Sequence, residues 1–387
     1  ADGDGWGAEV GGACFATWIT RPGDCDDTDA AVFPGAEDIC DGKQNDCDTP
    51  WSLADEQGRV THVDDAGVTT DLTPAPGSDL ALPSSGTVYV CGSEDAPVLA
   101  TLHVDALDGA LDILGISTGN GLATLDAGGT RTAVRVDENA GGTVTLVDLR
   151  ITGGGRGDGG KGGGIWAGEG SELKLARCEI AGNAGVFGGV WAIGTLDMVG
   201  TTISGNTMQD ADDVAEPVFY AGGLRTEGTA FVLDSIIRNN YSRQHGGGVH
   251  NAAGTLVLNN VLLVENYTDG EGAGLLVEGT TRLIGSMVAE NATATDDHAG
   301  GGVHVTGGSL FCAEGSVVKA NEGGDGAGVT LRSGAWMHAS GCDVRENTRH
   351  DGTPAEIWAA GALWTQPAHT CFQCGGDDGC GEWSCPG

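Results

Sequence analysis

Residues 255–279 read TLVLNNVLLVENYTDGEGAGLLVEG, and this stretch decides the fold of the chain. It contains a short alternating strand, a second strand that ends in Asn, a polar loop, several Gly and a third strand. Similar units occupy residues 172–194, 229–254, 280–308 and 309–334, and further units fit 143–171, 195–228 and 335–361. Only the polar loop changes length. Because no helical pattern separates the strands, the repeat predicts a solenoid.

Three short strands in a unit of about 27 residues predict an all-β solenoid of parallel strands, and this period and pattern resemble the right-handed parallel β-helix. About ten coils fit between residues 86 and 370, and a spacing of about 4.8 Å per coil makes a rod on the order of 50 Å long. One coil cannot bury its inner face alone, so stacking supplies both the core and the backbone hydrogen bonds.

An Asn recurs at the end of the second strand of each unit. Stacked in register, the side-chain amides would satisfy turn backbone groups that are otherwise buried without partners. We therefore predict a structural ladder without a catalytic role, formed by Asn183, Asn206, Asn240, Asn266, Asn291, Asn321 and Asn347.

The units, with GN-x-A followed by GGGV-x, resemble the repeats of polymorphic outer membrane proteins and of autotransporter-like surface proteins. The resemblance covers nearly three quarters of the chain. It implies a fold much more than a function.

The N-terminal segment is strongly acidic: residues 1–48 hold Asp at many alternating positions and few basic side chains. Carboxylate oxygens at alternate positions, with Gly that permits sharp turns, are what calcium requires. The sequence predicts calcium ligands at Asp2, Asp4, Asp24, Asp26, Asp27, Asp29, Asp41, Asn45, Asp46 and Asp48. The alternative is a solvated acidic linker closed by disulfides.

The order DGDGWG…C…GDCDDTDAAVFPGAEDICDG-x-x-NDCD resembles the MopE-type metal-binding module of secreted proteins. Its regularly spaced acidic residues are also similar to those of the calcium-binding thrombospondin type 3 repeat. Copper is not expected, because residues 1–50 contain no His or Met. The chain begins at Ala1, so the first DGDG site lacks an acidic residue that often precedes it.

Twelve cysteines lie mostly in two terminal clusters, which we interpret as disulfides formed in an oxidising compartment. The clusters are Cys14, Cys25, Cys40 and Cys47, then Cys371, Cys374, Cys380 and Cys385. Zinc at Cys371 and Cys374 is the alternative. Cys312 and Cys342, about one coil apart, can bridge adjacent turns, whereas Cys91 and Cys178 are expected to be small buried hydrophobes.

The residue after each GGGV should point away from the core by strand alternation. We predict an exposed binding or self-association stripe of Trp166, Trp191, Arg225, His250 and His304; the alternative is that loops cover it.

A net charge of −37 disfavours nucleic acid and anionic membranes as partners. The sequence contains no run of 18 apolar residues, so we expect no transmembrane helix. Paired acids such as Asp212-Asp213, Asp296-Asp297 and Asp377-Asp378 lack catalytic neighbours, which argues against a glycosidase.

We divide the chain into an acidic metal-binding module (1–50), a connector or N-terminal cap (51–85), the β-helix (86–370) and a Cys-rich C-terminal cap (371–387). The sequence predicts a secreted, calcium-stabilised structural or adhesive protein of the cell surface or extracellular matrix. Its partners would be further copies of itself or a cell-surface glycan, and filaments are one outcome. The alternative function is a polysaccharide lyase or hydrolase on the β-helix face.

Overall fold

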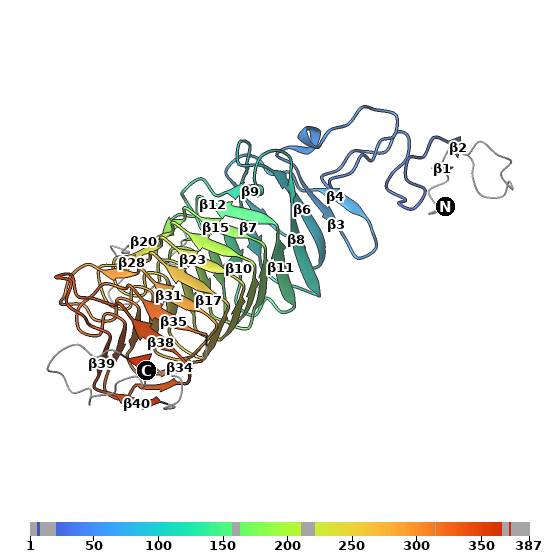
Figure 1. Cartoon of the computed structure of the whole chain (residues 1–387). Coiled ribbons are helices and arrows are strands. Elements are labelled where there is room, and N and C mark those ends of the chain that lie inside the picture. The colour runs from blue at the N-terminus through green and yellow to red at the C-terminus, as the bar shows by residue number, and fades with distance from the viewer. Residues whose placement is uncertain are drawn as a thin grey trace.

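The fold is known from a computed structural model that describes residues 6–7, 21–156, 163–209, 221–313, 315–365 and 371–372. Side-chain contacts are described within 23–361, apart from the gaps in these ranges. The chain forms a parallel β-solenoid of about 10 turns, as the repeats predict, and the described residues include one short 3₁₀ helix, η1 (Leu53–Glu56). Figure 1 shows the coils stacked into a rod, with the acidic segment extending beyond the N-terminal end.

The first strand of each coil belongs to a 13-stranded sheet, here called the long sheet. In spatial order its strands are β4 (Thr69–Asp71), β3 (Val60–Val63), β6 (Gly86–Gly92), β8 (Ala110–Ser117), β11 (Thr143–Val147), β14 (Glu172–Ala176), β18 (Thr195–Val199), β22 (Thr229–Leu233), β26 (Thr255–Asn259), β30 (Thr280–Ile284), β34 (Ser309–Cys312), β37 (Trp336–Ala339) and β40 (Ala362–Thr365). The strands from β6 onward pair in parallel, one coil to the next.

Two further parallel ladders complete the rod. The second ladder contains β9 (Ala123–Asp126), β12 (Leu149–Thr152), β15 (Glu179–Ala181), β19 (Thr202–Ser204), β23 (Ile236–Arg238), β27 (Leu262–Val264), β31 (Met287–Ala289), β35 (Val317–Lys319), β38 (Asp343–Arg345) and β41 (Cys371–Phe372). The third contains β5 (Ser78–Ala81), β7 (Val98–Val104), β10 (Val134–Val136), β13 (Ile165–Ala167), β17 (Val190–Ala192), β21 (Leu224–Thr226), β25 (Val249–Asn251), β29 (Leu275–Val277), β33 (Val303–Val305), β36 (Val329–Leu331) and β39 (Ile357–Ala359).

The middle coils carry a fourth, two-residue strand that the repeat pattern did not predict. These strands form a small sheet of β16 (Ala184–Gly185), β20 (Thr207–Met208), β24 (Tyr241–Ser242), β28 (Tyr267–Thr268) and β32 (Ala292–Thr293). Near the N-terminus β1 (Trp6–Gly7) pairs with β2 (Arg21–Pro22).

The core is one continuous column of aliphatic side chains. In β26 the residues alternate, so that Leu256 and Leu258 are fully buried while Val257 and Asn259 face outward. The same alternation in neighbouring coils stacks the inward side chains in register, so that Leu258 lies between Val232 and Leu283 and Leu256 lies between Ala230 and Thr281. Packing between coils therefore provides the apolar burial that a single coil lacks.

The N-terminal edge of the long sheet is closed by an antiparallel hairpin. β3 pairs antiparallel with β6 and then with β4, which ends the run of parallel strands. The outer strand of this hairpin, β4, is only three residues long, so the sheet edge left at this end is short. The segment predicted as a connector thus contributes strands to the solenoid.

The seven Asn side chains lie in one buried column at the turn after the second-ladder strand. In the first six, Nδ2 donates to the Oδ1 of the next Asn, at 2.8–3.0 Å. From Asn206 onward, each Oδ1 also accepts the backbone N–H of the preceding Asn, whereas Asn183 Oδ1 accepts Gly154 N–H. Nδ2 also donates to a carbonyl one coil back, for example in Asn240 and Asn266. The residue before each Asn has a left-handed backbone conformation, which turns the chain sharply. Examples are Gly182 (φ 68°), Glu265 (φ 56°) and Ala320 (φ 52°).

The column ends on a buried carboxylate that the sequence did not reveal. Asn347 has no further Asn to which it can donate, and its Nδ2 and N–H donate to Glu356 at 2.6 Å and 3.2 Å. Glu356 is 1 % exposed, and burial raises its pKa above the ordinary value. The aligned amides point their donors at Glu356, so this side chain terminates the ladder.

We expect Glu356→Ala to destabilise the last coils by about 2 kcal/mol, because both donors of Asn347 lose an acceptor. Glu356→Gln retains an acceptor without the charge. Because burial raises the folded pKa of Glu356 above its ordinary value, the pH-dependent part of its contribution to stability is complete below that ordinary value and is lost as the pH rises through the folded pKa. The difference in denaturant midpoint between wild type and Glu356→Gln should therefore change with pH; a constant difference would contradict this role.

Candidate metal-binding module at the N-terminal end

The described part of the module, residues 23–50, contains little regular structure and is held by a disulfide and a few buried side chains. Cys25 and Cys47 form a disulfide with a Cα–Cα distance of 5.8 Å. Phe33 pairs with Asp46 in an isolated parallel bridge. Val32 and Ile39 are buried. Because this core is so small, hydrogen bonds to the carboxylates must hold most of the loop backbone in place.

The alternating carboxylates act first on their own backbone. Each accepts the N–H two residues later: Asp24 from Asp26 at 2.8 Å, Asp26 from Thr28 at 3.2 Å, Asp29 from Ala31 at 3.2 Å, Asp41 from Lys43 at 2.9 Å and Asp46 from Asp48 at 3.0 Å. These turns explain the regular spacing of Asp in the sequence. They occupy one oxygen of each carboxylate with a local hydrogen bond.

Asp24 offers the strongest structural indication of a cation. Its side chain is 5 % exposed, Oδ1 accepts Asp26 N–H, and Oδ2 is buried without a hydrogen-bond partner among the described residues. A buried carboxylate oxygen left in this way costs free energy unless it is paired. A hard cation such as calcium is a suitable partner for this oxygen, so the residues present fit the predicted metal.

Other predicted ligands already have internal roles. Asn45 is fully buried, its Oδ1 accepts Ile39 N–H at 3.0 Å, and its Nδ2 donates to Asp41 Oδ2. Asp29 binds Lys43 Nζ at 2.5 Å, a pairing that lowers the Asp29 pKa. Asn45 therefore crosslinks the loop, and Asp29 would have to release Lys43 before it could bind a metal. Asp27 and Asp48 lie on the same loops.

Asp38, which the sequence prediction omitted, organises the second loop. Its Oδ1 accepts the N–H groups of Asn45 and Asp46, both at 3.0 Å. Its carbonyl accepts from the Arg59 guanidinium at 2.5 Å. The isolated position of Asp38 between PGAE and CDG gave no spacing signal for this role.

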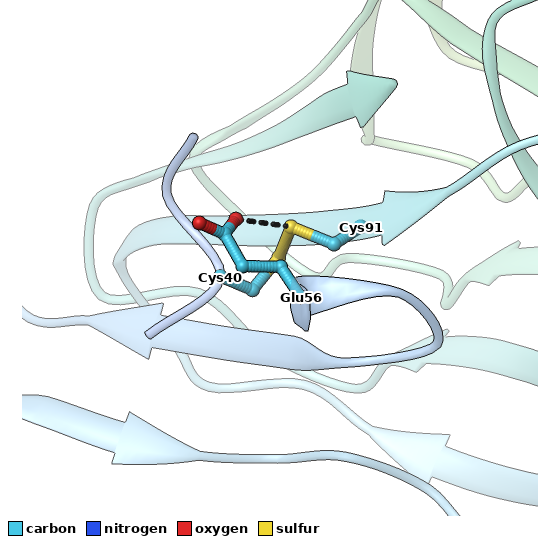
Figure 2. A group of neighbouring side chains, drawn as sticks. All are labelled: Cys40, Glu56 and Cys91. Carbon is cyan, nitrogen blue, oxygen red and sulfur yellow. Dashed lines mark hydrogen bonds between the residues drawn. A yellow bond between two sulfur atoms is a disulfide. The ribbon is translucent and has the colours of Figure 1, made fainter. Parts of the chain in front are cut away.

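The module is joined to the solenoid by a disulfide that we did not predict. Cys40 bonds Cys91 at the end of β6, so the expectation that Cys91 is a free buried thiol is wrong. Glu56 of η1 lies beside this bond, with Oε2 3.2 Å from Cys91 Sγ, as Figure 2 shows. Glu56 also accepts from Gly42 N–H and Trp51 Nε1, and burial raises its pKa to about 6.

The other cysteine predictions have mixed outcomes. Cys312 and Cys342 form a disulfide between adjacent coils, and Cys178 is a buried free thiol, as expected. The remaining positions, Asp2, Asp4, Cys14, Cys374, Cys380 and Cys385, lie outside the described residues, as do the acid pairs at 212–213 and 377–378. Cys371 is described only as part of β41.

The predicted exposed stripe is covered, which corrects that expectation. Its side chains point away from the core and are in register across β13, β17, β21, β25 and β33. However, Trp166, His250 and His304 are at most 1 % exposed and Arg225 is 9 % exposed. Alternation determined their direction, and the polar loops between coils cover them.

Beneath these loops the stripe forms a polar network. Arg225 donates to Glu227 and contacts His250 Nδ1 at 3.1 Å, and His250 Nε2 lies 3.1 Å from Glu278. Arg332 donates to His304 Nε2, and burial lowers the His304 pKa to about 4. Trp166 packs with Phe187 in a small second core, where Trp191 is partly buried. The network pairs buried charges and orders the loops.

A second group with metal-ligand chemistry lies on the third ladder. His103 Nε2 is 2.9 Å from Asp105 and 3.2 Å from Asp137. Arg135 occupies the other oxygen of Asp137 at 2.6 Å and lowers its pKa together with His103. A cationic neighbour of this kind favours an ion-pair cluster over a metal site.

These features define the class: a parallel β-solenoid protein with an acidic, disulfide-bonded module at its N-terminal end. The family model described as "Putative metal-binding motif", of the MopE copper-binding type, matches residues 24–49. No curated protein and no solved structure matches the chain. The comparisons thus support the metal-binding motif, while the resemblances to polymorphic outer membrane proteins and thrombospondin repeats rest on sequence pattern alone. Among the described residues no helix has the length and apolarity needed to cross a membrane.

Proposed function

We propose that this chain is a non-enzymatic structural protein of the cell surface or extracellular matrix, whose N-terminal module is ordered by calcium. The observation that carries the metal proposal is the buried, unpartnered Oδ2 of Asp24 within the matched motif. The three disulfides formed among the described residues favour an oxidising, extracellular location. The acidic composition favours a divalent cation over an anionic partner for the module.

Calcium is preferred over copper on the chemistry of the donors. Residues 24–49 offer carboxylate, amide and carbonyl oxygens, whereas their cysteines Cys25, Cys40 and Cys47 are all in disulfides. Oxygen ligands suit calcium, and copper prefers imidazole or sulfur. Bound calcium would neutralise part of the module charge and supply the partner that Asp24 lacks.

The rod architecture supports a spacer or scaffold role. The solenoid is bonded along its whole length by parallel ladders, and the module is tied to its first coil through Cys91. Such a rod can hold a binding module at a defined distance from a surface, or join further copies end to end. We propose homotypic assembly as the use of the two ends.

Calcium removal is expected to loosen the module and leave the solenoid intact. A calcium concentration of about 100 Kd would stabilise the module by about 2.7 kcal/mol, and this increment should disappear with chelator. The measurement is backbone hydrogen exchange of residues 23–50 with calcium and with chelator. Asp24→Asn should reproduce the chelator effect, whereas Asp297→Asn, at an exposed loop position, should not.

Light scattering of the same samples tests assembly. If calcium neither binds nor changes hydrogen exchange in the module, the metal proposal is wrong. If the protein remains a monomer in both conditions, the assembly proposal is wrong.

A further inference from the structure

The outward face of five neighbouring strands of the long sheet has an unusual set of side chains. The strands are β22, β26, β30, β34 and β37, and we call their outward side chains the aromatic face. Its members that matter most here are Phe231, Arg282, Ile284, Phe311, Trp336 and His338. Unlike the stripe on the third ladder, much of this face is open.

Large apolar groups are exposed on the aromatic face. Phe231 is 48 % and Trp336 38 % exposed. Phe311 lies between Arg282 and Trp336, with a ring centroid 4.8 Å from that of Trp336 in an edge-to-face arrangement. A groove of about 210 Å³ follows Arg282, Ile284, Phe311 and His338. Exposed aromatic rings beside a groove are typical of ligand-binding surfaces.

The charge of the face is opposite to that of the rest of the protein. The chain has 55 acidic residues, yet none of the outward positions in these five strands is acidic. Earlier strands of the same sheet carry Glu172 and Asp197 at equivalent outward positions. Arg282 stacks 4.9 Å above the Phe311 ring, and no described carboxylate forms an ion pair with it. An unpaired guanidinium beside exposed rings is complementary to an anion with an apolar face.

Hydroxyl groups border the rings in a regular row. Thr229, Thr255, Thr280 and Ser309 follow one another in register, one per coil, beside the column that contains Phe231, Arg282 and Phe311. Each hydroxyl can donate and accept. A row of this kind suits a long polyhydroxylated ligand that lies along the rod.

We propose that the aromatic face binds an acidic polysaccharide of the hexuronate class. Arg282 binds a uronate carboxylate, and the C–H groups on one side of the sugar ring pack on Trp336 and Phe311. The row of Thr and Ser hydroxyls forms hydrogen bonds with the hydroxyl groups of the sugars. This inference names the partner of the proposed surface protein and rests on that role, but not on the metal. A second copy bound through the same face is a poorer occupant, because no outward position of these five strands is acidic and the copy would offer Arg282 no carboxylate.

The test is binding of full-length protein to alginate or polygalacturonate, with dextran as the neutral comparison. Titration calorimetry should show binding to the uronate polymers that weakens with salt, and no binding to dextran. Arg282→Gln should weaken binding at least about tenfold, the loss of one charge-assisted contact. Trp336→Ala should also weaken it. Arg238→Gln is the matched control, since Arg238 is an exposed arginine on the second ladder.

Three outcomes overturn the proposal. They are no binding of either uronate polymer, equal binding by Arg282→Gln and wild type, or a dimer that is lost in Trp336→Ala. Binding that persists in chelator, with loss of order in the module, would separate this site from the calcium proposal.

Discussion

Asn266→Ala is expected to lower the free energy of unfolding by about 3–5 kcal/mol. Asn266 is fully buried in the middle of the ladder, where its Oδ1 accepts from both the N–H and the Nδ2 of Asn240. Its Nδ2 donates to Ile237 O and to Asn291 Oδ1. Truncation leaves these groups without partners in a low-dielectric interior, where unmade hydrogen bonds cost most.

The loss should be visible in the denaturant midpoint and in hydrogen exchange of the flanking coils. Asn259→Ala is the matched control, because Asn259 lies on the same coil but faces solvent, and we expect a change within about 0.5 kcal/mol. Asn266→Asp keeps the size of the side chain but cannot donate to Asn291. If both ladder variants behave like Asn259→Ala, the column does not stabilise the rod.

The double variant Cys40→Ala/Cys91→Ala should release the module from the solenoid, at a loss of about 4 kcal/mol. The bond joins residues 51 positions apart, so it removes a large loop-closure entropy from the unfolded ensemble. Both cysteines are fully buried, and Gly58 N–H donates to Cys91 O at 2.8 Å beside them. Hydrogen exchange at Gly58 therefore reports whether the junction stays closed.

The control is Cys25→Ala/Cys47→Ala, which removes a bond within the module. Its 22-residue separation predicts a loss of about 3 kcal/mol that is confined to residues 23–50. Exchange at Gly58 should be fast in the first double variant and slow in this one. Equal exchange rates in the two would show that the junction is held by other contacts.

The repeat pattern determined most of the solenoid and its ladder, because both depend on local periodicity. Alternation in segments such as 255–259 specifies which side chains enter the core, and one Asn per coil specifies a column of amides. The left-handed turn before each Asn was less evident, because non-glycine residues such as Glu265 and Ala320 occupy several of these positions. There the stacked coils hold a conformation that the residue alone does not favour.

Within the candidate site, the spacing of Asp identified the loops but not the task of each carboxylate. Asp24 and Asn45 were predicted as equivalent ligands, yet Asn45 is occupied by Ile39 N–H and Asp24 retains a buried oxygen without a partner. Asp38 was omitted because its acceptor role depends on residues seven and eight positions later.

By itself the sequence determined the parallel solenoid, the buried Asn column and the position of the metal-binding motif. Each depends on a short local pattern: strand alternation, one Asn per coil, and the regular spacing of Asp. Only the tertiary structure decided that Cys40 bonds Cys91, that Glu356 ends the ladder, that loops cover His250 and His304, and that Arg282 stacks on Phe311. These contacts join residues on different coils or across loops of unequal length. Strand alternation determines whether a side chain points into or away from the core. The loops and neighbouring coils that fold over it determine which residues it contacts.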